Sequence, residues 1–205
     1  MSAIPPHLRK IRKLKRHGSI SETENLVAKS LYDLELHHKS LRQHLPRFHF
    51  NTAKVVQRGG DDKKKALVVL YPLRYFMLVR KVQKALTSEL EKKFSGHIAL
   101  FIAQRTIKKR PTDVYKLQSV QRSQTSTAVF ENILNDMLHP SDIVGQRVKC
   151  RVDGSKVKKV FLDTRDRKRI EPRLPIIAHV YRQLTHRTIS FGFMWNPKLQ
   201  QVSNR

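Results

Sequence analysis

The sequence predicts an α+β fold: a single domain with a mixed β-sheet, packed helices, a basic β-hairpin and a flexible basic N-terminal arm. Three observations lead to this class. A strand, a helix of crossover length and a second strand follow one another between Ala66 and Ala103. An alternating stretch reverses direction at Asp153-Gly154. Apolar residues three and four positions apart mark helices before, between and after these strands.

The first twenty residues predict a flexible arm. They carry six Lys/Arg and no acidic residue, so collapse would bring like charges together with little apolar area to offset the repulsion. The expected domain covers residues 21–194, and residues 195–205 form a polar tail.

A first helix is predicted from Ser21 to about His38. Ser21 and Glu24 have the spacing of a capping box, in which each side chain bonds the other residue's backbone N–H. The apolar residues that follow at helical spacing are Val27, Leu31 and Leu34. A short turn with Leu41 and Leu45 then ends at Pro46.

An α/β unit comes next. Residues 52–57 predict a strand, 59–62 a turn, and 66–71 an apolar strand of the kind buried on both faces. A helix with a regular apolar stripe follows from Tyr75 to Phe94, and Gly96 lies where a helix C-cap is expected. The strand at 98–103 completes the unit.

The second half begins with a basic surface loop at 105–124. A helix follows from about Ser126 to His139-Pro140, and then the hairpin at about 147–162. A second basic loop covers 165–173. The last elements predicted are a short helix around Ile177 to Leu184 and a strand with one apolar face, formed by Ile189, Phe191 and Phe193.

The outgoing hairpin strand has the sharpest local pattern. Arg147, Lys149 and Arg151 alternate with Val148, Cys150 and Val152, so one face is a row of three cations. The other three residues are expected to point inward. Cys150 lies between two cations, which would favour a reactive thiolate, but its strand parity predicts an inert core thiol.

Net charge is the strongest functional signal. The chain has 42 Lys+Arg against 16 Asp+Glu, a net charge of +26 on 205 residues. Such an excess repels itself unless a polyanion neutralises it, and nucleic acid is the first candidate. A membrane surface is the rival polyanion, but it requires an amphipathic basic helix or a lipid anchor, and the sequence shows neither. No apolar run approaches the roughly 20 residues of a membrane span.

The basic residues predict RNA rather than DNA. They lie in four separated segments, and contacts spread over a surface fit a large folded RNA. The sequence has no heptads or zinc ligands for duplex DNA, and no aromatic-rich strand pair for stacking single strands. The predicted RNA-binding residues are Arg9, Lys10, Arg12, Lys13, Lys15, Arg16, Arg105, Lys108, Lys109, Arg110, Arg147, Lys149, Arg151, Lys156, Lys158, Lys159, Arg167, Lys168 and Arg169.

No catalytic residue, metal site or cofactor is predicted. A single cysteine excludes an intrachain disulfide and a cysteine-based zinc site. His37 and His38 diverge around a helix, and no further ligand completes a metal set with them. A phosphate-cradling glycine loop is absent from the sequence.

Several linked motifs resemble the S7e family of eukaryotic small-subunit ribosomal proteins, which is unrelated to the bacterial protein of the same number. They are Leu-Glu-Lys-Lys-Phe-Ser-Gly at 90–96, Phe-Ile-Ala-Gln-Arg at 101–105, Thr-Ala-Val at 127–129, Pro-Ser-Asp-Ile-Val-Gly at 140–145, Val-Asp-Gly-Ser at 152–155 and Val-x-Leu-Asp at 160–163. Their order and spacing also match, so the resemblance covers residues 22–193.

The resemblance implies a structural, non-enzymatic α+β protein on the body of the small subunit of the cytosolic ribosome, joining during nucleolar assembly. It implies small-subunit rRNA, neighbouring small-subunit proteins and assembly factors as partners, with no membrane and no homo-oligomer. An RNA-processing enzyme or a transient assembly factor is the alternative. The two readings differ in copy number on the mature small subunit.

Overall fold

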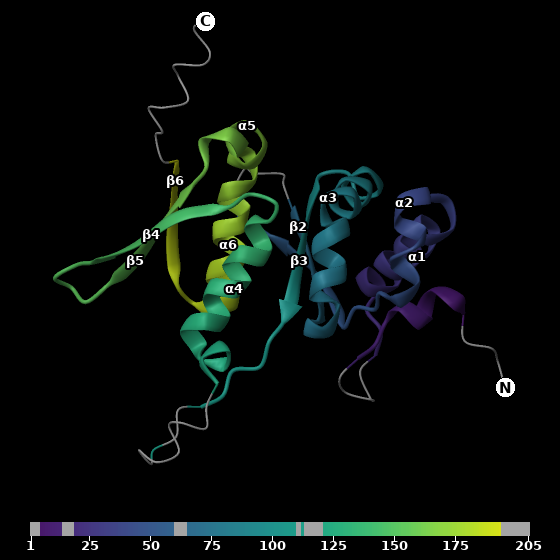
Figure 1. The fold of residues 1–205 in the computed structure, drawn as a ribbon, viewed down its shortest axis with the longest axis horizontal. Coiled ribbons are helices and arrows are strands. Elements are labelled where there is room, and N and C mark those ends of the chain that lie inside the picture. The colour runs from purple at the N-terminus through teal and green to yellow at the C-terminus, as the bar shows by residue number, and fades with distance from the viewer. Residues whose placement is uncertain (1–4, 14–18, 60–64, 110–111, 113–120, 194–205) are drawn as a thin grey trace, which may run out of the picture. The chain divides into compact units, whose positions relative to one another are not determined.

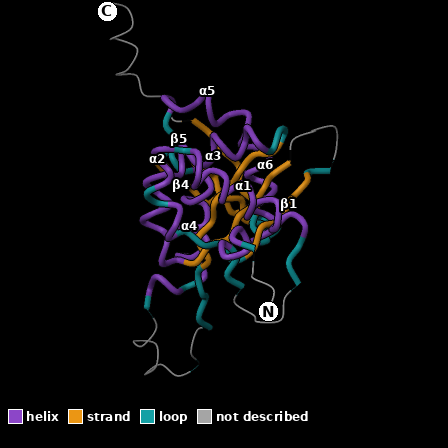
Figure 2. Tube along the Cα trace, turned by 90° about the vertical axis from the view of Figure 1, so that its right-hand side faces the viewer, coloured by secondary structure: helices purple, strands orange, loops and turns teal. Residues whose placement is uncertain are grey.

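The computed structural model describes residues 5–13, 19–59, 65–109, 112 and 121–193. Helices and strands are interleaved along these residues (Figure 1, Figure 2), which confirms the α+β class. The chain divides into two compact units, Met1–Met137 and Leu138–Arg205. Each unit holds one mixed three-stranded sheet, whereas the sequence predicted a single mixed sheet.

The first sheet has the order β1-β2-β3, with β1 at Thr52–Gln57, β2 at Lys65–Pro72 and β3 at His97–Gln104. β1 runs antiparallel to β2, and β2 runs parallel to β3. The crossover between the parallel strands is α3, Phe76–Lys93. Gly96 follows with φ +75°, the left-handed conformation expected at a helix end. These predictions are confirmed, but residues 60–62 of the predicted turn lie outside the described residues.

Both faces of this sheet are buried, as the continuous apolar strands predicted. One face packs with α1 (Glu22–His37), α2 (Lys39–Arg42) and α3 into the main core (Figure 1). Phe48 is central to this core, because its ring meets Tyr71 and Phe101 edge-on at centroid distances of 5.9 and 6.4 Å. The opposite face carries a second buried set, which includes Val68, Leu100 and Ile102.

The predicted capping box begins α1. The Ser21 backbone N–H donates to the Glu24 carboxylate at 3.0 Å, and the predicted apolar stripe of this helix is buried. The turn after α1 consists of α2 and the 3₁₀-helix η2, Leu45–Arg47.

The N-terminal segment differs from a flexible arm where the structure describes it. Residues Pro6–Lys10 form a 3₁₀-helix, η1, and Ile11 forms a parallel bridge with Phe50. Lys10 is only 5% exposed: its Nζ donates to the Leu45 carbonyl at 2.6 Å and pairs with the Glu35 carboxylate. Those two acceptors lie 35 and 25 positions farther along the sequence. The prediction of a flexible arm considered only the charges of the first twenty residues, so it did not include these acceptors. Residues 1–4 and 14–18 lie outside the described residues.

Helix α4, Ser126–Leu138, joins the first unit through Asp136. The Ala103 N–H donates to the Asp136 carboxylate at 3.1 Å, and the Gln83 amide donates to the Asp136 carbonyl at 3.3 Å. The helix ends where the sequence predicted, just before His139-Pro140.

The second sheet has the order β4-β5-β6, with β4 at Ile143–Cys150, β5 at Lys156–Leu162 and β6 at Thr188–Phe193. β4 and β5 form the predicted hairpin, and Gly154 in its turn has φ +76°. β6 runs parallel to β5 after a crossover that contains α6, Leu174–Thr185. Both units therefore share one topology: an antiparallel strand pair, a helical crossover and a parallel third strand.

The second basic loop is helical instead. Residues 164–173 form η6 (Thr164–Asp166), α5 (Arg167–Ile170) and η7 (Glu171–Arg173). Arg169 pairs with Asp166 at 3.0 Å and Arg167 pairs with Glu171 at 3.2 Å, three and four residues apart. Carboxylates at helical spacing partly offset the repulsion among these cations, which explains why turns form here.

We expect Lys10→Met to lower the free energy of unfolding by about 2 to 3 kcal/mol, because it leaves the Glu35 carboxylate without its cation in a largely buried position. The double variant Lys10→Met/Glu35→Met should recover most of that loss, since neither charge then remains. Urea denaturation followed by circular dichroism measures both. An unchanged midpoint in Lys10→Met would contradict the structural role of this pair.

Candidate nucleic-acid interface

The hairpin gathers cations on one face of the second sheet. Arg147 is directly opposite Lys159, and Lys149 is opposite Val157, so the three cations share a face. The ring of Phe161 lies beneath two of them, with the Arg147 guanidinium 5.8 Å and the Lys159 ammonium 5.3 Å from its centroid. These cation–π contacts hold long basic side chains over a half-buried aromatic ring.

Carboxylates are nearly absent from the hairpin. Residues 143–162 contain six Lys/Arg and one acid, Asp153, in the turn. Arg147 and Lys159, directly opposite one another, are like charges that repel across the strands. No ion pair joins Arg147, Lys149 or Lys159 to any residue that the structure describes. The geometry therefore creates an uncompensated positive surface, which an anion would stabilise.

The opposite face of the hairpin contradicts the sequence prediction. Val148 is 58% exposed, Val152 is fully exposed, and the Cys150 thiol is exposed as well. Periodicity correctly assigned these residues to one side, but no layer covers that side at the tip. The core of this unit begins nearer the hairpin base, where Val160 and Leu162 are fully buried. Figure 1 shows β4 and β5 extending beyond β6 and α6.

Residues 167–169 form a second exposed basic group in the same unit. The Arg167 guanidinium lies 5.4 Å from the centroid of the Phe193 ring. Arg169 donates to the Ser141 hydroxyl at 3.4 Å, and Lys168 is exposed. The predicted residues here are on the surface, although two of them already have carboxylate partners.

The structure places two predicted RNA-binding residues inside the first unit. The Lys10 side chain is buried against Glu35, as described above. The Arg105 side chain is 9% exposed, and its guanidinium donates to the Asp136 carboxylate at 2.5 Å and lies 5.5 Å from the centroid of the Phe76 ring. Both side chains therefore stabilise the fold through their ion pairs. RNA cannot contact either buried cation without breaking its ion pair.

The remaining predicted residues of the first unit fall into three groups. Arg9, Arg12, Lys108 and Lys109 are exposed. Lys13 is half-buried, and its ammonium pairs with Glu24 at 2.9 Å. Lys15, Arg16 and Arg110 lie outside the described residues.

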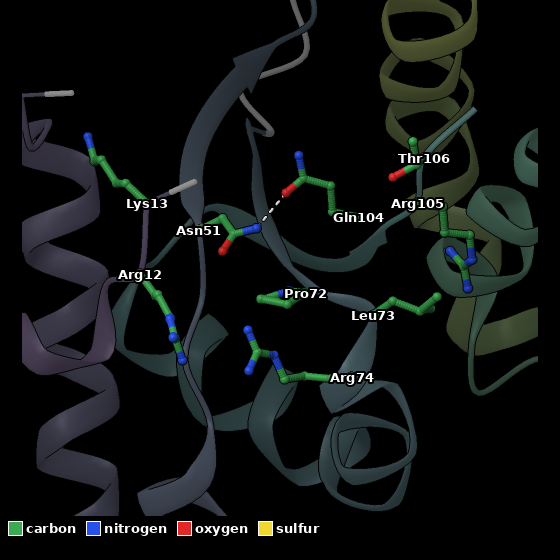
Figure 3. A pocket seen from close by; sticks show the side chains of 9 residues that line it. All are labelled: Arg12, Lys13, Asn51, Pro72, Leu73, Arg74, Gln104, Arg105 and Thr106. Carbon is green, nitrogen blue, oxygen red and sulfur yellow. Dashed lines mark hydrogen bonds between the residues drawn. The ribbon is translucent and has the colours of Figure 1, made fainter. Parts of the chain in front are cut away.

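One cavity of about 580 Å³ brings basic residues from separate segments together (Figure 3). It lies at the carboxyl ends of the parallel strands β2 and β3, an edge where ligands commonly bind in α/β sheets. Its lining consists of Arg12, Lys13, Asn51, Pro72, Leu73, Arg74, Gln104, Arg105 and Thr106. Sequence reasoning missed Arg74. Its position two residues after the end of a buried parallel strand was the available signal.

The basic residues near the cavity affect the pKa of His49. Partial burial lowers the pKa of His49 below its ordinary value of 6.5, and the positive charges of Lys10, Arg12 and Arg74 lower it further. Its ring stacks on Tyr75, with 5.8 Å between centroids, and its Nδ1 lies 3.2 Å from the Tyr75 hydroxyl. The pKa of His49 therefore depends on the positive charge of the nearby arginines.

In the described ranges, no three His, Cys, Asp or Glu side chains gather as a set that could hold a metal ion. Among the helices of those ranges, none has both the length and the apolarity needed to span a bilayer.

Comparison with known proteins gives one consistent family. Residues 10–193 match the family model described as ribosomal protein S7e. The chain is 40% identical to small ribosomal subunit protein eS7 of Schizosaccharomyces pombe over 174 residues, covering 84% of this chain and 88% of that protein. It is 39% identical to the eS7 of Avicennia marina over 186 residues, covering 91% and 96%. The eS7B of Saccharomyces cerevisiae is 38% identical over 172 residues, covering 83% and 90%.

We expect a maleimide to label Cys150 in the folded chain at close to its rate in urea, because the thiol lies on an uncovered hairpin face. Cys150→Ala should change the free energy of unfolding by less than about 0.5 kcal/mol, as surface substitutions usually do. Strong protection of the thiol that disappears on unfolding would restore the inward orientation predicted from the sequence.

Proposed function

The chain belongs to the ribosomal protein S7e family, and from this membership we propose that it is a structural constituent of the small subunit of the cytosolic eukaryotic ribosome. In that role it binds and stabilises rRNA and takes part in small-subunit assembly and rRNA maturation. Its partners are small-subunit rRNA, neighbouring small-subunit proteins and assembly factors. It acts as a monomer away from membranes, with an assembly stage in the nucleolus.

The observation that carries rRNA binding is the hairpin face with Arg147, Lys149 and Lys159, whose charges no ion pair compensates among the described residues. Arg151 follows directly after the last residue of β4. Arg147 and Lys149 lie two residues apart on β4, and such residues on a strand are about 7 Å apart. This spacing is comparable with the distance between successive phosphates of one RNA strand. A row of cations held at that spacing favours contact with the sugar-phosphate backbone, so it recognises RNA shape rather than base sequence.

The apolar side of the hairpin tip supports burial in an assembly. Val148 and Val152 are exposed beside Cys150, and the cations Lys158 and Lys156 are opposite Val148 and Cys150 across the strand pair. Exposed apolar groups that adjoin one another are typical of interaction sites. We infer that RNA covers the cationic face while the ribose edges of RNA or a neighbouring ribosomal protein cover the apolar one.

Copy number separates this function from the alternative of an RNA-processing enzyme or a transient assembly factor. Sucrose-gradient fractionation with quantitative protein counting should give one copy per mature small subunit, retained after a high-salt wash. A processing enzyme or assembly factor would be found substoichiometrically, on precursor particles, and would dissociate from mature subunits. That second outcome would overturn the proposal.

We expect the triple variant Arg147→Gln/Lys149→Gln/Arg151→Gln to fold but to incorporate several-fold less into small subunits in direct competition with the parent chain. Loss of three phosphate contacts should also lower the slope of log affinity against log salt by about three. The matched control Lys81→Gln/Lys84→Gln/Arg182→Gln removes the same charge from exposed helix positions. Equal incorporation of the hairpin variant and the parent would show that the row is only a solvated face.

A further inference from the structure

Two arginines in the cavity at the carboxyl ends of β2 and β3 face one another. In Figure 3 the side chains of Arg12 and Arg74 point toward one another below Pro72, whereas the side chains of Lys13 and Arg105 extend in other directions. Arg12 follows the Ile11–Phe50 bridge, and its N–H donates to the Phe50 carbonyl at 2.8 Å, which fixes its backbone. Arg74 lies over the Tyr75 ring, 5.4 Å from its centroid.

These two guanidinium groups differ from the other cations of the cavity. Lys13 pairs with Glu24 and Arg105 pairs with Asp136. Neither Arg12 nor Arg74 forms an ion pair with a carboxylate in the described part of the chain. Two guanidinium groups aimed at one point repel each other, and an oxyanion between them converts this repulsion into charge-assisted, bidentate hydrogen bonds.

The cavity is larger than an oxyanion requires. At about 580 Å³ it falls in the range of small-molecule sites. Pro72 and Leu73 supply an apolar part of the wall. Beyond Pro72, the Asn51 amide donates to the Gln104 side-chain oxygen at 2.5 Å (Figure 3). That bond leaves the Asn51 oxygen, which Figure 3 shows on the side of the arginines, as an acceptor, whereas the Gln104 nitrogen points to the opposite side. Amide side chains recognise base edges through such groups.

We propose that this cavity binds one unpaired nucleotide of RNA, with its phosphate between Arg12 and Arg74 and its base beside Pro72 and the Asn51–Gln104 amide pair. The inference rests on the proposed rRNA-binding function and adds a defined site to it. An acidic protein segment is the other ligand with a matching charge. It would use the arginines but would leave the apolar wall and the amide pair unoccupied, so RNA accounts for more of the lining.

The test uses the full-length chain and nuclear magnetic resonance titrations with uridine 5′-monophosphate, uridine and inorganic phosphate. We expect the monophosphate to shift the side-chain signals of Arg12, Arg74, Asn51 and Gln104, and inorganic phosphate to shift the arginine signals alone. The monophosphate should also raise the pKa of His49, because its negative charge offsets the arginine field. Arg12→Gln/Arg74→Gln should bind the monophosphate at least about tenfold more weakly, as expected for the loss of hydrogen bonds between charged groups.

The matched control is Lys81→Gln/Lys84→Gln, which removes two exposed cations from α3 outside the cavity and should change the affinity by less than about twofold. An equal loss of affinity in the control variant would show that the net positive charge of the chain attracts the nucleotide, without a specific site in this cavity. Tighter binding of a phosphoserine peptide than of the nucleotide, or shifts of the arginine signals without the amide signals, would overturn the nucleotide site. The proposed function survives such results if the chain still incorporates stoichiometrically, and it fails separately if the chain does not.

Discussion

Glu35 and Asp136 each hold a cation that comes from a distant part of the chain. Glu35 receives Lys10 and thereby docks the N-terminal segment on α1, while Asp136 joins α4 to β3 through Arg105 and the Ala103 N–H. Acidic residues are scarce, 16 against 42 Lys+Arg. The positions of the acidic residues therefore determine which basic segments pack into the fold and which stay exposed on the surface.

Cations without such partners gather where the fold leaves a surface open. In the first unit, sheet faces are buried on both sides, and the open position is the strand edge with Arg12 and Arg74. In the second unit, the same strand topology leaves one sheet face uncovered, with Arg147 and Lys159 over Phe161. One topology thus leaves two kinds of basic surface, a pocket at the carboxyl ends of the strands and a flat basic face.

Local sequence patterns predicted the positions of the helices and strands well, but they did not predict which side chains pack against them. Spacing of apolar residues identified α1, α3 and the strands of both sheets, because burial of one helix stripe or of a strand imposes that spacing. At the hairpin, alternation was present without a covering layer, so the inward prediction for Cys150 was wrong. The buried pairs of Lys10 and Arg105 join residues 25 and 31 positions apart, and the approach of Arg12 to Arg74 requires the folded sheet. No local pattern indicates such contacts.

The docking of the N-terminal segment also affects how the chain folds during its synthesis. Lys10 reaches the Leu45 carbonyl 35 residues ahead, and Ile11 reaches Phe50, so every partner of this segment named above has been translated before the first sheet is complete. The Ile11–Phe50 bridge closes a loop of 39 residues, similar to the 32 residues between paired positions of β2 and β3, so the two closures cost similar entropy and the order of synthesis distinguishes them. The N-terminal segment can therefore dock on α1 before the ribosome that makes the chain has released β3, whereas the packing of Phe48 is completed only when Tyr71 and Phe101 arrive.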